Sequence, residues 1–192
     1  MKKTVALLIL VGCILTMTSC MPLSIITSVI DTVYAALNPD YEAEDESFSF
    51  GKLNITLTAE FYEVWRDDIS AEFNSTSGTY VCIDRHEFMY SDFEPDDILS
   101  MAEKFRERIV SESENDDSVK NISEVANEDG IIFLSYDYSF ITTEKYLVCF
   151  YKDSVNLWVV YFCCPDTSYD TYLPYFKKWA RSVTIDISGT EI

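Results

Sequence analysis

The feature that most constrains the fold is an uninterrupted apolar segment, Leu157–Phe162, in which odd and even positions are both large and hydrophobic. Successive side chains of a β-strand point to opposite faces of its sheet. A strand that is apolar on both faces therefore has to be central, with another layer of structure above and below it. We expect helices or a second sheet on both sides of this strand.

Composition agrees with one folded domain. The chain has 192 residues, of which 48% are hydrophobic and 15% are aromatic. Aromatic side chains bury large areas, which offsets the conformational entropy lost on folding. The 14 basic and 33 acidic residues leave a net charge of -19, which nucleic-acid phosphates and anionic lipid headgroups would repel. We therefore exclude nucleic-acid binding, while the charge by itself indicates a solvated surface and identifies no ligand.

The last third of the chain has the pattern of a β-meander. Ile131–Tyr138 and Tyr146–Tyr151 precede the central strand and are also rich in β-branched and aromatic residues, with short polar turns expected between the three. Strands joined by short turns pair antiparallel with their neighbours. With residues 153–156 as the last turn, Cys149 should lie opposite Val160.

The first half of the domain is also predicted to be mostly β-strand. Apolar or aromatic residues alternate with polar ones in Phe48–Leu53, Ile55–Trp65 and Thr79–Tyr90. Asn74–Gly78 consists of residue types that are typical of turns, and it precedes the third of these strands.

Two amphipathic helices are predicted. The first follows Pro95–Asp97, which supplies proline and negative charge at a helix start, and it ends before an acidic loop, Ser111–Asp117. The second covers Tyr172–Ala180 and tolerates Pro174 only in its first turn, because proline lacks the backbone N–H that a helix interior needs. A closing strand, Val183–Ile187, is expected after it.

Together these elements indicate an α+β fold in a single domain over residues 47–192, an antiparallel β-sheet meander flanked by amphipathic helices. Their order, with Phe48–Leu57 first, then the helix, Trp158–Phe162 and Phe176–Val183, is similar to that of the PsbP-like fold. The resemblance implies an exported or extrinsic domain, since many members of that superfamily are bacterial lipoproteins, and it brings no shared catalytic residues. The long apolar segment before residue 38 departs from the family pattern.

The N-terminus has the pattern of an export signal, in which two lysines precede the mostly apolar segment Val5–Met17. Met17-Thr18-Ser19-Cys20 resembles the end of a bacterial lipoprotein signal, where the cysteine is lipidated and becomes the first residue after cleavage. We therefore predict a signal peptide over residues 1–19 and a lipid on Cys20. That lipid would hold the domain on the extracytoplasmic face of the cell membrane.

Three alternatives remain for this segment. Leu10-Val11-Gly12-Cys13 also fits a lipidation site, but cleavage there would leave a short apolar region. Ordinary signal cleavage near Ala36 would release a freely secreted protein. An uncleaved anchor over residues 5–30 approaches the length that spans a bilayer, although Pro22 weakens it.

Residues 20–46 are predicted to form the lipidated N-terminus, an apolar helix and an acidic tether. Apolar residues recur at helical spacing in Leu23–Leu37, which fits equally a helix on the membrane and a helix packed on the domain. Asn38–Glu46 begins with an Asn-Pro pair and is acidic, which is typical of a self-repelling linker. The globular domain is expected to begin near Ser47.

Residue types that carry chemistry are scarce. His86 is the single histidine, which excludes sites that need two, and its charged neighbours indicate a solvent-facing or salt-bridged residue. The sequence has no glycine-rich phosphate loop and no dinucleotide-binding fingerprint. We accordingly predict no catalytic residue, no metal and no cofactor, and Cys20 is the one functional residue that we name.

Four cysteines fall within the predicted domain: Cys82, Cys149, Cys163 and Cys164. The predicted register places Cys149 and Cys163 too far apart for a bridge, and Cys163 and Cys164 point to opposite faces of one strand. Buried free thiols are therefore favoured. A bridge from Cys82 to a neighbouring strand is the alternative.

Two hypotheses on function follow. The favoured one is an envelope-tethered, non-enzymatic binding or accessory domain whose acidic surface and aromatic-rich sheet meet an envelope protein or a glycan. It requires a groove or an exposed aromatic patch. The alternative is a secreted hydrolase that acts through paired carboxylates. It requires a cleft with two carboxylates about 5 to 10 Å apart, at least one of them with a raised pKa.

Overall fold

The computed structural model describes residues 44–89, 96–114 and 116–186. The predicted signal peptide over 1–19, the lipidation sites Cys20 and Cys13, and the alternative cleavage near Ala36 lie outside these residues. Within them, neither helix is long and apolar enough to cross a membrane.

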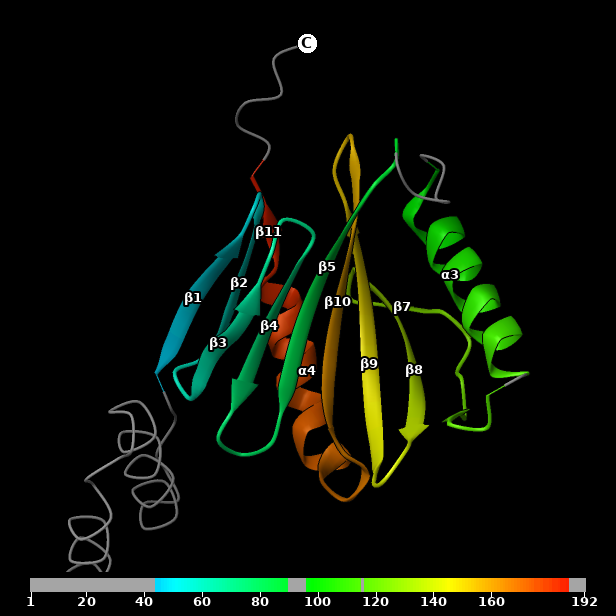
Figure 1. The fold of residues 1–192 in the computed structure, drawn as a ribbon. Coiled ribbons are helices and arrows are strands. Elements are labelled where there is room, and N and C mark those ends of the chain that lie inside the picture. The colour runs from blue at the N-terminus through cyan, green and yellow to red at the C-terminus, as the bar shows by residue number, and fades with distance from the viewer. Residues whose placement is uncertain (1–43, 90–95, 115, 187–192) are drawn as a thin grey trace, which may run out of the picture. The chain divides into compact units, whose positions relative to one another are not determined.

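The described residues form two antiparallel sheets and two α-helices (Figure 1). The larger sheet has the strand order β3 (Phe61–Arg66), β4 (Ser70–Ser75), β5 (Tyr80–Glu87), β10 (Asn156–Pro165), β9 (Thr143–Lys152), β8 (Ile131–Ser139) and β6 (Val119–Lys120), and β7 (Ala126–Glu128) also pairs with β8. The smaller sheet has the order β1 (Asp45–Phe50), β2 (Leu53–Thr58) and β11 (Thr184–Ile185). The helices are α3 (Ile98–Ser113) and α4 (Tyr169–Ser182), and a short 3-10 turn, η1 (Asp166–Ser168), precedes α4.

Strand β10 is central, as its apolar sequence predicted. It lies between β5 and β9, and Leu157, Trp158 and Val160 are each at most 1% exposed. Cys149 pairs with Val160, so the predicted register of the β9–β10 hairpin is confirmed. The carboxylate of Asp153 holds the turn of this hairpin, because it accepts hydrogen bonds from two backbone N–H groups of the turn and from the indole of Trp158 at 3.2 Å.

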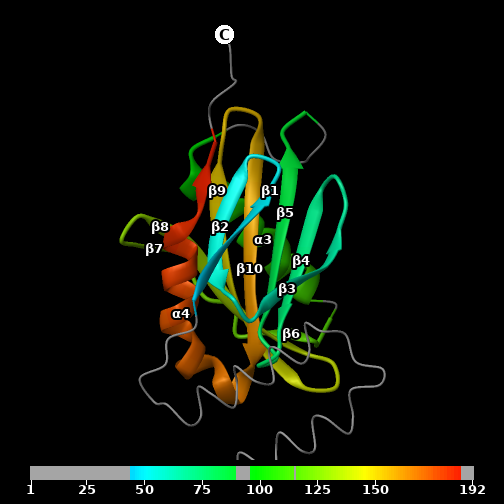
Figure 2. The same cartoon turned by 90° about the vertical axis from the view of Figure 1, so that its left-hand side faces the viewer.

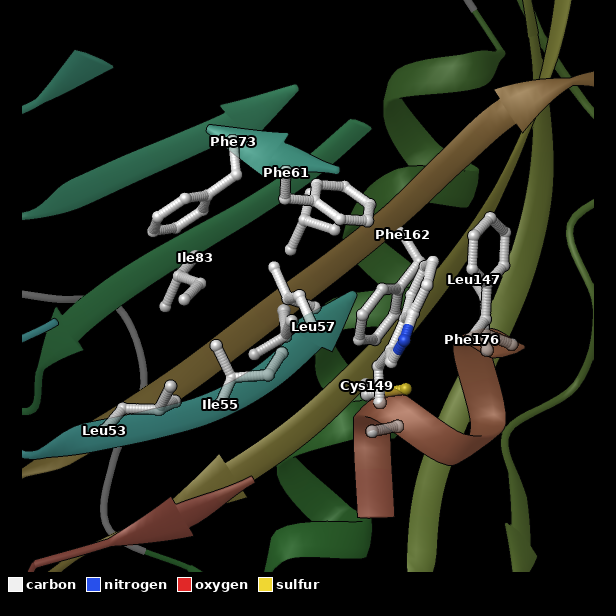
Figure 3. Packing of buried hydrophobic residues seen from close by; sticks show 14 of the residues in the cluster. Leu53, Ile55, Leu57, Phe61, Phe73, Ile83, Leu147, Cys149, Phe162 and Phe176 are labelled. Carbon is white, nitrogen blue, oxygen red and sulfur yellow. The ribbon is translucent and has the colours of Figure 1, made fainter. Parts of the chain in front are cut away.

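Each face of the large sheet packs a separate hydrophobic core. One face packs against the small sheet and α4, and Figure 3 shows side chains of β2 and α4 directed into this core. The other face packs against α3 through Met101, Ala102 and Phe105. Figure 2 shows β1 and β2 in front of the large sheet and α3 behind it. The α+β architecture that the sequence predicted is therefore present, with a helix on either side of the meander.

The predicted strand over residues 55–65 is wrong, because a turn at Ala59 and Glu60 divides it into β2 and β3. The two halves belong to different sheets. Periodicity could not reveal this break, since a two-residue turn leaves the alternation of apolar positions unchanged from Leu57 to Phe61. The predicted strand over residues 48–53 is likewise divided, by a turn at Gly51 and Lys52.

Several other boundaries also differ from the prediction. Strand β4 was not predicted, because its polar residues have weak strand propensity and only Ala71, Phe73 and Ser75 are buried. Strand β9 begins at Thr143 and not at Tyr146, so the polar residues 143–145, which were expected in a turn, belong to the strand. Strand β1 begins at Asp45 and takes up the last residues of the predicted acidic tether.

Both helices are longer than the sequence indicated. Helix α3 continues to Ser113, into the predicted loop, because the solvent-facing side of its last turn needs no apolar residue. Helix α4 begins at Tyr169, so Pro174 lies beyond the first turn, contrary to the prediction. Pro174 interrupts the backbone hydrogen bonds of α4, because it has no N–H to donate. The helix nevertheless continues past it and buries Phe176 and Trp179 against the large sheet.

Gly51 is expected to be more sensitive to substitution than Gly78, although both adopt positive φ (57° and 82°). A Cβ at Gly51 would lie 3.1 Å from the ring of buried Trp158, whereas a Cβ at Gly78 would have no atom within 4 Å. Gly78→Ala should lower the free energy of unfolding by about 1 kcal/mol, and Gly51→Ala by about 1 to 3 kcal/mol more. Urea denaturation of the two variants checks this. Equal losses would show that the Trp158 contact carries no cost.

Candidate functional site

Helix α3 covers only part of its face of the large sheet. It packs on β8 and β9, and the buried residues of this core come from α3 and from β8, β9 and β10. Strands β3, β4 and β5 extend beyond this core, and several of their side chains on the same face are exposed or half-buried. The uncovered part of the sheet is therefore the place to look for a binding surface.

A row of directly paired residues crosses this face. Tyr62 pairs with Asn74, Asn74 with Tyr80, Tyr80 with Cys163, and Cys163 with Tyr146. Directly opposite residues of neighbouring strands point to the same face of a sheet. Tyrosines from three strands that are distant in sequence are therefore brought onto one surface, around Asn74 and Cys163.

This row forms the floor of a pocket of about 410 Å³. The remaining walls are Glu144 at the start of β9, Ser75 at the end of β4 and the β4–β5 turn. The lining residues are Tyr62, Asn74, Ser75, Gly78, Thr79, Tyr80, Glu144, Tyr146 and Cys163. We call this site the tyrosine pocket.

Glu144 is held in place by its neighbours. Its Oε2 accepts a hydrogen bond from the Tyr146 hydroxyl at 3.2 Å and one from the Cys163 thiol at 3.7 Å. The Tyr146 ring stacks on Tyr136, with ring centroids 4.9 Å apart. By contrast, Tyr62 is 43% exposed, so its ring is accessible to a ligand.

Tyr80, Tyr146 and the Cys163 thiol of this pocket are neutral at physiological pH. Burial is the main cause that raises the pKa of Tyr80, and the neighbouring Cys82 raises it further. Burial is also the main cause that raises the pKa of Tyr146, and Cys163 raises it further. Burial also raises the pKa of Cys163 to about 12, which leaves it protonated and a poor nucleophile. The lining includes no lysine, arginine or histidine, so Glu144 is its one ionised side chain.

The structure places the other residues singled out by the sequence elsewhere. His86 is half-buried on β5 opposite Leu157 and does not line the pocket. Burial lowers the pKa of His86, Asp84 opposes that shift, and Arg108 adds to it. Within the described residues, no group of three His, Cys, Asp or Glu side chains is placed to hold a metal ion.

All four cysteines of the domain are free thiols. The Cys82 thiol donates a hydrogen bond to Asp84 and lies 3.5 Å from the Ser70 hydroxyl, so the alternative of a Cys82 bridge is not realised. Cys149 is fully buried, and burial raises its pKa. Inert buried thiols, rather than a redox site, fit this environment.

The hydrolase hypothesis needs two carboxylates in one cleft, and the pocket lining drawn from the described residues contains one, Glu144. Glu60 has a raised pKa because of burial, which hydrogen bonds from Ser77 and Thr58 partly oppose. It lies in the β2–β3 turn and is not part of the lining. The carboxylate with the raised pKa and the carboxylate of the pocket therefore belong to different sites.

Sequence reasoning predicted an aromatic-rich sheet but not this pocket. The β9–β10 register alone would have placed Tyr146 opposite Cys163. The positions of Tyr80 and Asn74 depend on the pairing of β5 with β10 and of β4 with β5. The sequence pattern indicated neither of these pairings.

Comparison with solved structures identifies the fold. The solution structure of cyanobacterial PsbP (CyanoP) from Synechocystis sp. PCC 6803 is similar with a TM-score of 0.51 and 11% identity, covering 77% of this chain and 95% of that chain. A mutant of the protein Mog1 is similar with a TM-score of 0.51 and 10% identity, covering 77% of this chain and 98% of that chain. This chain thus has the PsbP-like α+β fold that its element order resembled. No protein-family model and no curated protein sequence matches it.

Glu60 should make stability decrease as pH rises. Below its ordinary pKa of 4.5 the carboxyl is protonated in both the folded and the unfolded chain, but above that pH the unfolded chain ionises first. Stability is therefore lost from about pH 4.5 up to the raised pKa of the folded protein. Glu60→Gln should remove this loss, so the free energy of unfolding of wild type relative to the variant should fall with pH.

Urea denaturation across this pH range measures that difference. Glu107→Gln, on an exposed position of α3, controls for the removal of a charge. A difference between wild type and Glu60→Gln that is constant with pH would contradict the assigned burial of Glu60.

Proposed function

We propose that this chain is an exported, non-enzymatic binding domain, tethered to the outer face of the cell membrane by a lipid on Cys20, that binds a neutral glycan in the tyrosine pocket. The observation that carries the proposal is the pocket itself, an open aromatic surface on the part of the sheet that α3 leaves uncovered. An envelope protein is the other partner class that the sequence suggested.

The chemistry of the lining supports a glycan. Sugar rings combine apolar C–H faces, which pack on aromatic rings, with hydroxyl groups that need donors and acceptors. Tyr62 offers an accessible ring, while the Asn74 amide offers both donors and an acceptor. A volume of about 410 Å³ falls in the range of small-molecule sites and suits one or two sugar rings.

The charge of the pocket supports a neutral ligand. Its one ionised side chain is the carboxylate of Glu144, and the chain as a whole has a net charge of -19. An anionic ligand would have to approach this surface without any cationic partner in the lining, at an electrostatic cost. Phosphorylated and carboxylated glycans, like nucleic acids, are therefore disfavoured.

The proposed tether rests on the N-terminal sequence. Two lysines, an apolar segment and a cysteine preceded by small residues form the pattern of a lipoprotein signal at Cys20. The PsbP-like fold is compatible with this assignment, since the resemblance in element order implies an exported or extrinsic domain. A tethered binding domain would then present its pocket to the glycans of the envelope.

Lipidation at Cys20 can be tested with two cysteine variants. The mature wild-type protein should begin at Cys20, carry diacylglycerol and partition into detergent, and Cys20→Ala should lose the lipid and leave the detergent phase. Cys13→Ala is the matched control and should behave like wild type. Intact mass and detergent partitioning measure both properties. A mature protein that begins near Ala36, or loss of the lipid in Cys13→Ala alone, would contradict the assignment.

Glycan binding can be tested at Tyr62. Calorimetry with a panel of uncharged oligosaccharides should identify a ligand, and Tyr62→Ala should weaken its binding about tenfold, because loss of an aromatic packing surface costs about 1 to 1.5 kcal/mol. Tyr175→Ala on α4 is the matched control, since Tyr175 is 48% exposed and lies outside the pocket. Equal effects of the two variants, or binding of no uncharged oligosaccharide, would argue against this ligand class.

A further inference from the structure

The turn between β8 and β9 carries two bulky apolar side chains that are almost fully exposed. Phe140 is 82% exposed and Ile141 is 88% exposed, and they are adjacent in sequence. Met89 is the other large hydrophobic residue with an exposure above 80% in the described part of the chain, and it lies in a turn just after β5. The pair at the β8–β9 turn therefore forms a small apolar tip.

Neither packing nor turn geometry accounts for this tip. Hairpin turns favour Gly, Asn and Asp, whereas an aromatic and a β-branched residue offer no advantage in a turn. The hairpin is closed without them, because Ser139 pairs with Thr143 and their hydroxyls lie 3.0 Å apart. Two exposed apolar side chains at this position are thus unnecessary for folding, and they would be better accommodated in an apolar environment.

The tip lies at the same end of the domain as the pocket and the first strand. Glu144 of the pocket follows Ile141 closely along the chain, and the β4–β5 turn, which supplies Gly78 and Thr79 to the pocket, is at this end as well (Figure 1). The start of β1 is linked to that turn, since Asp45 pairs with Thr58 and Glu60 accepts hydrogen bonds from both Thr58 and Ser77. The first strand of the domain therefore begins at the end that carries the tip (Figure 1).

A membrane fits this tip better than a protein partner does. Two side chains present far less than the roughly 1,200 Å² that a stable protein interface buries. A bilayer makes no such demand when the protein is already attached to it, because tethering raises the effective concentration of a weak second contact. Apolar residues at a hairpin turn whose neighbouring strand residues are polar can enter the lipid interface without carrying charged groups with them.

We propose that Phe140 and Ile141 insert into the interfacial region of the membrane to which the chain is tethered. This inference rests on the tether in the proposed function, but not on the glycan ligand. Insertion is shallow, because the carboxylates of Asp137 and Glu144 lie on the strands just behind the tip and remain in water. The tyrosine pocket then opens close to the membrane surface, which favours envelope glycans anchored near the bilayer.

The experiment places a fluorescent reporter at the tip of the full-length chain. Phe140→Trp is reconstituted into phosphatidylcholine vesicles that contain the same lipid brominated on its acyl chains. Val155→Trp is the matched control, because Val155 is 51% exposed in the turn at the other end of β9. Both substitutions introduce the same interfacial preference of tryptophan, and subtraction of the wild-type signal removes the native tryptophans, of which Trp65 is 45% exposed.

The expected result is a blue-shifted emission that brominated lipid quenches for Trp at position 140 and not for Trp at position 155. Adding Ile141→Asp to the Phe140→Trp variant should abolish that quenching, because a carboxylate would have to enter the interface. Vesicle flotation of the same samples reports the tether separately. If the protein floats with the vesicles but Trp at position 140 is not quenched, the tip inference is overturned and the tether stands. If the protein does not float with the vesicles, both the tether and the tip inference are contradicted. If the emission of the Phe140→Trp variant shifts to the blue in the absence of vesicles as protein concentration rises, the tip contacts a second copy of the chain and the membrane proposal is overturned.

Discussion

The structure depends on the burial of β10 on both faces. Leu157, Trp158, Val159 and Val160 are almost completely inaccessible to water, so each face of this strand needs its own cover. The small sheet and α4 cover one face, and α3 covers the other. Because α3 is a single helix lying over β8 and β9, it cannot also cover β3, β4 and β5. The open surface that holds the tyrosine pocket is therefore a consequence of how the central strand is buried.

The pocket shows how antiparallel pairing can assemble a site from residues that are distant in sequence. Tyr62, Tyr80 and Tyr146 come from three strands, yet the register places them in one row on one face. Burial raises the pKa of Tyr80 and Tyr146, so these phenols stay neutral, and Glu144 supplies the single charge. A surface that combines aromatic rings with neutral hydrogen-bonding groups is suited to binding.

The likeness to CyanoP and Mog1 concerns the fold, since the identities are 11% and 10%. Folds of this kind carry unrelated functions, so function has to be argued from the site. Here the β4–β5 turn, which contributes to the pocket, the β8–β9 turn, which carries the apolar tip, and the start of β1 lie at one end of the domain (Figure 1). The proposed membrane contact and the proposed ligand site are therefore at the end of the domain where its first strand begins.

The sequence by itself determined the parts of the fold that local contacts specify. The β9–β10 register could be predicted because a short turn held by Asp153 sets it, and the central position of β10 followed from apolar residues on both faces. The α+β class and the presence of both helices followed from periodicity. Only the tertiary structure decided that β2 and β3 belong to different sheets, that polar β4 is a strand, and that β5 pairs with β10. Those pairings join segments far apart in the chain, and side-chain periodicity carries no information about which distant strand a strand will meet. The tyrosine pocket depends on them, which is why its residues could not be named from the sequence.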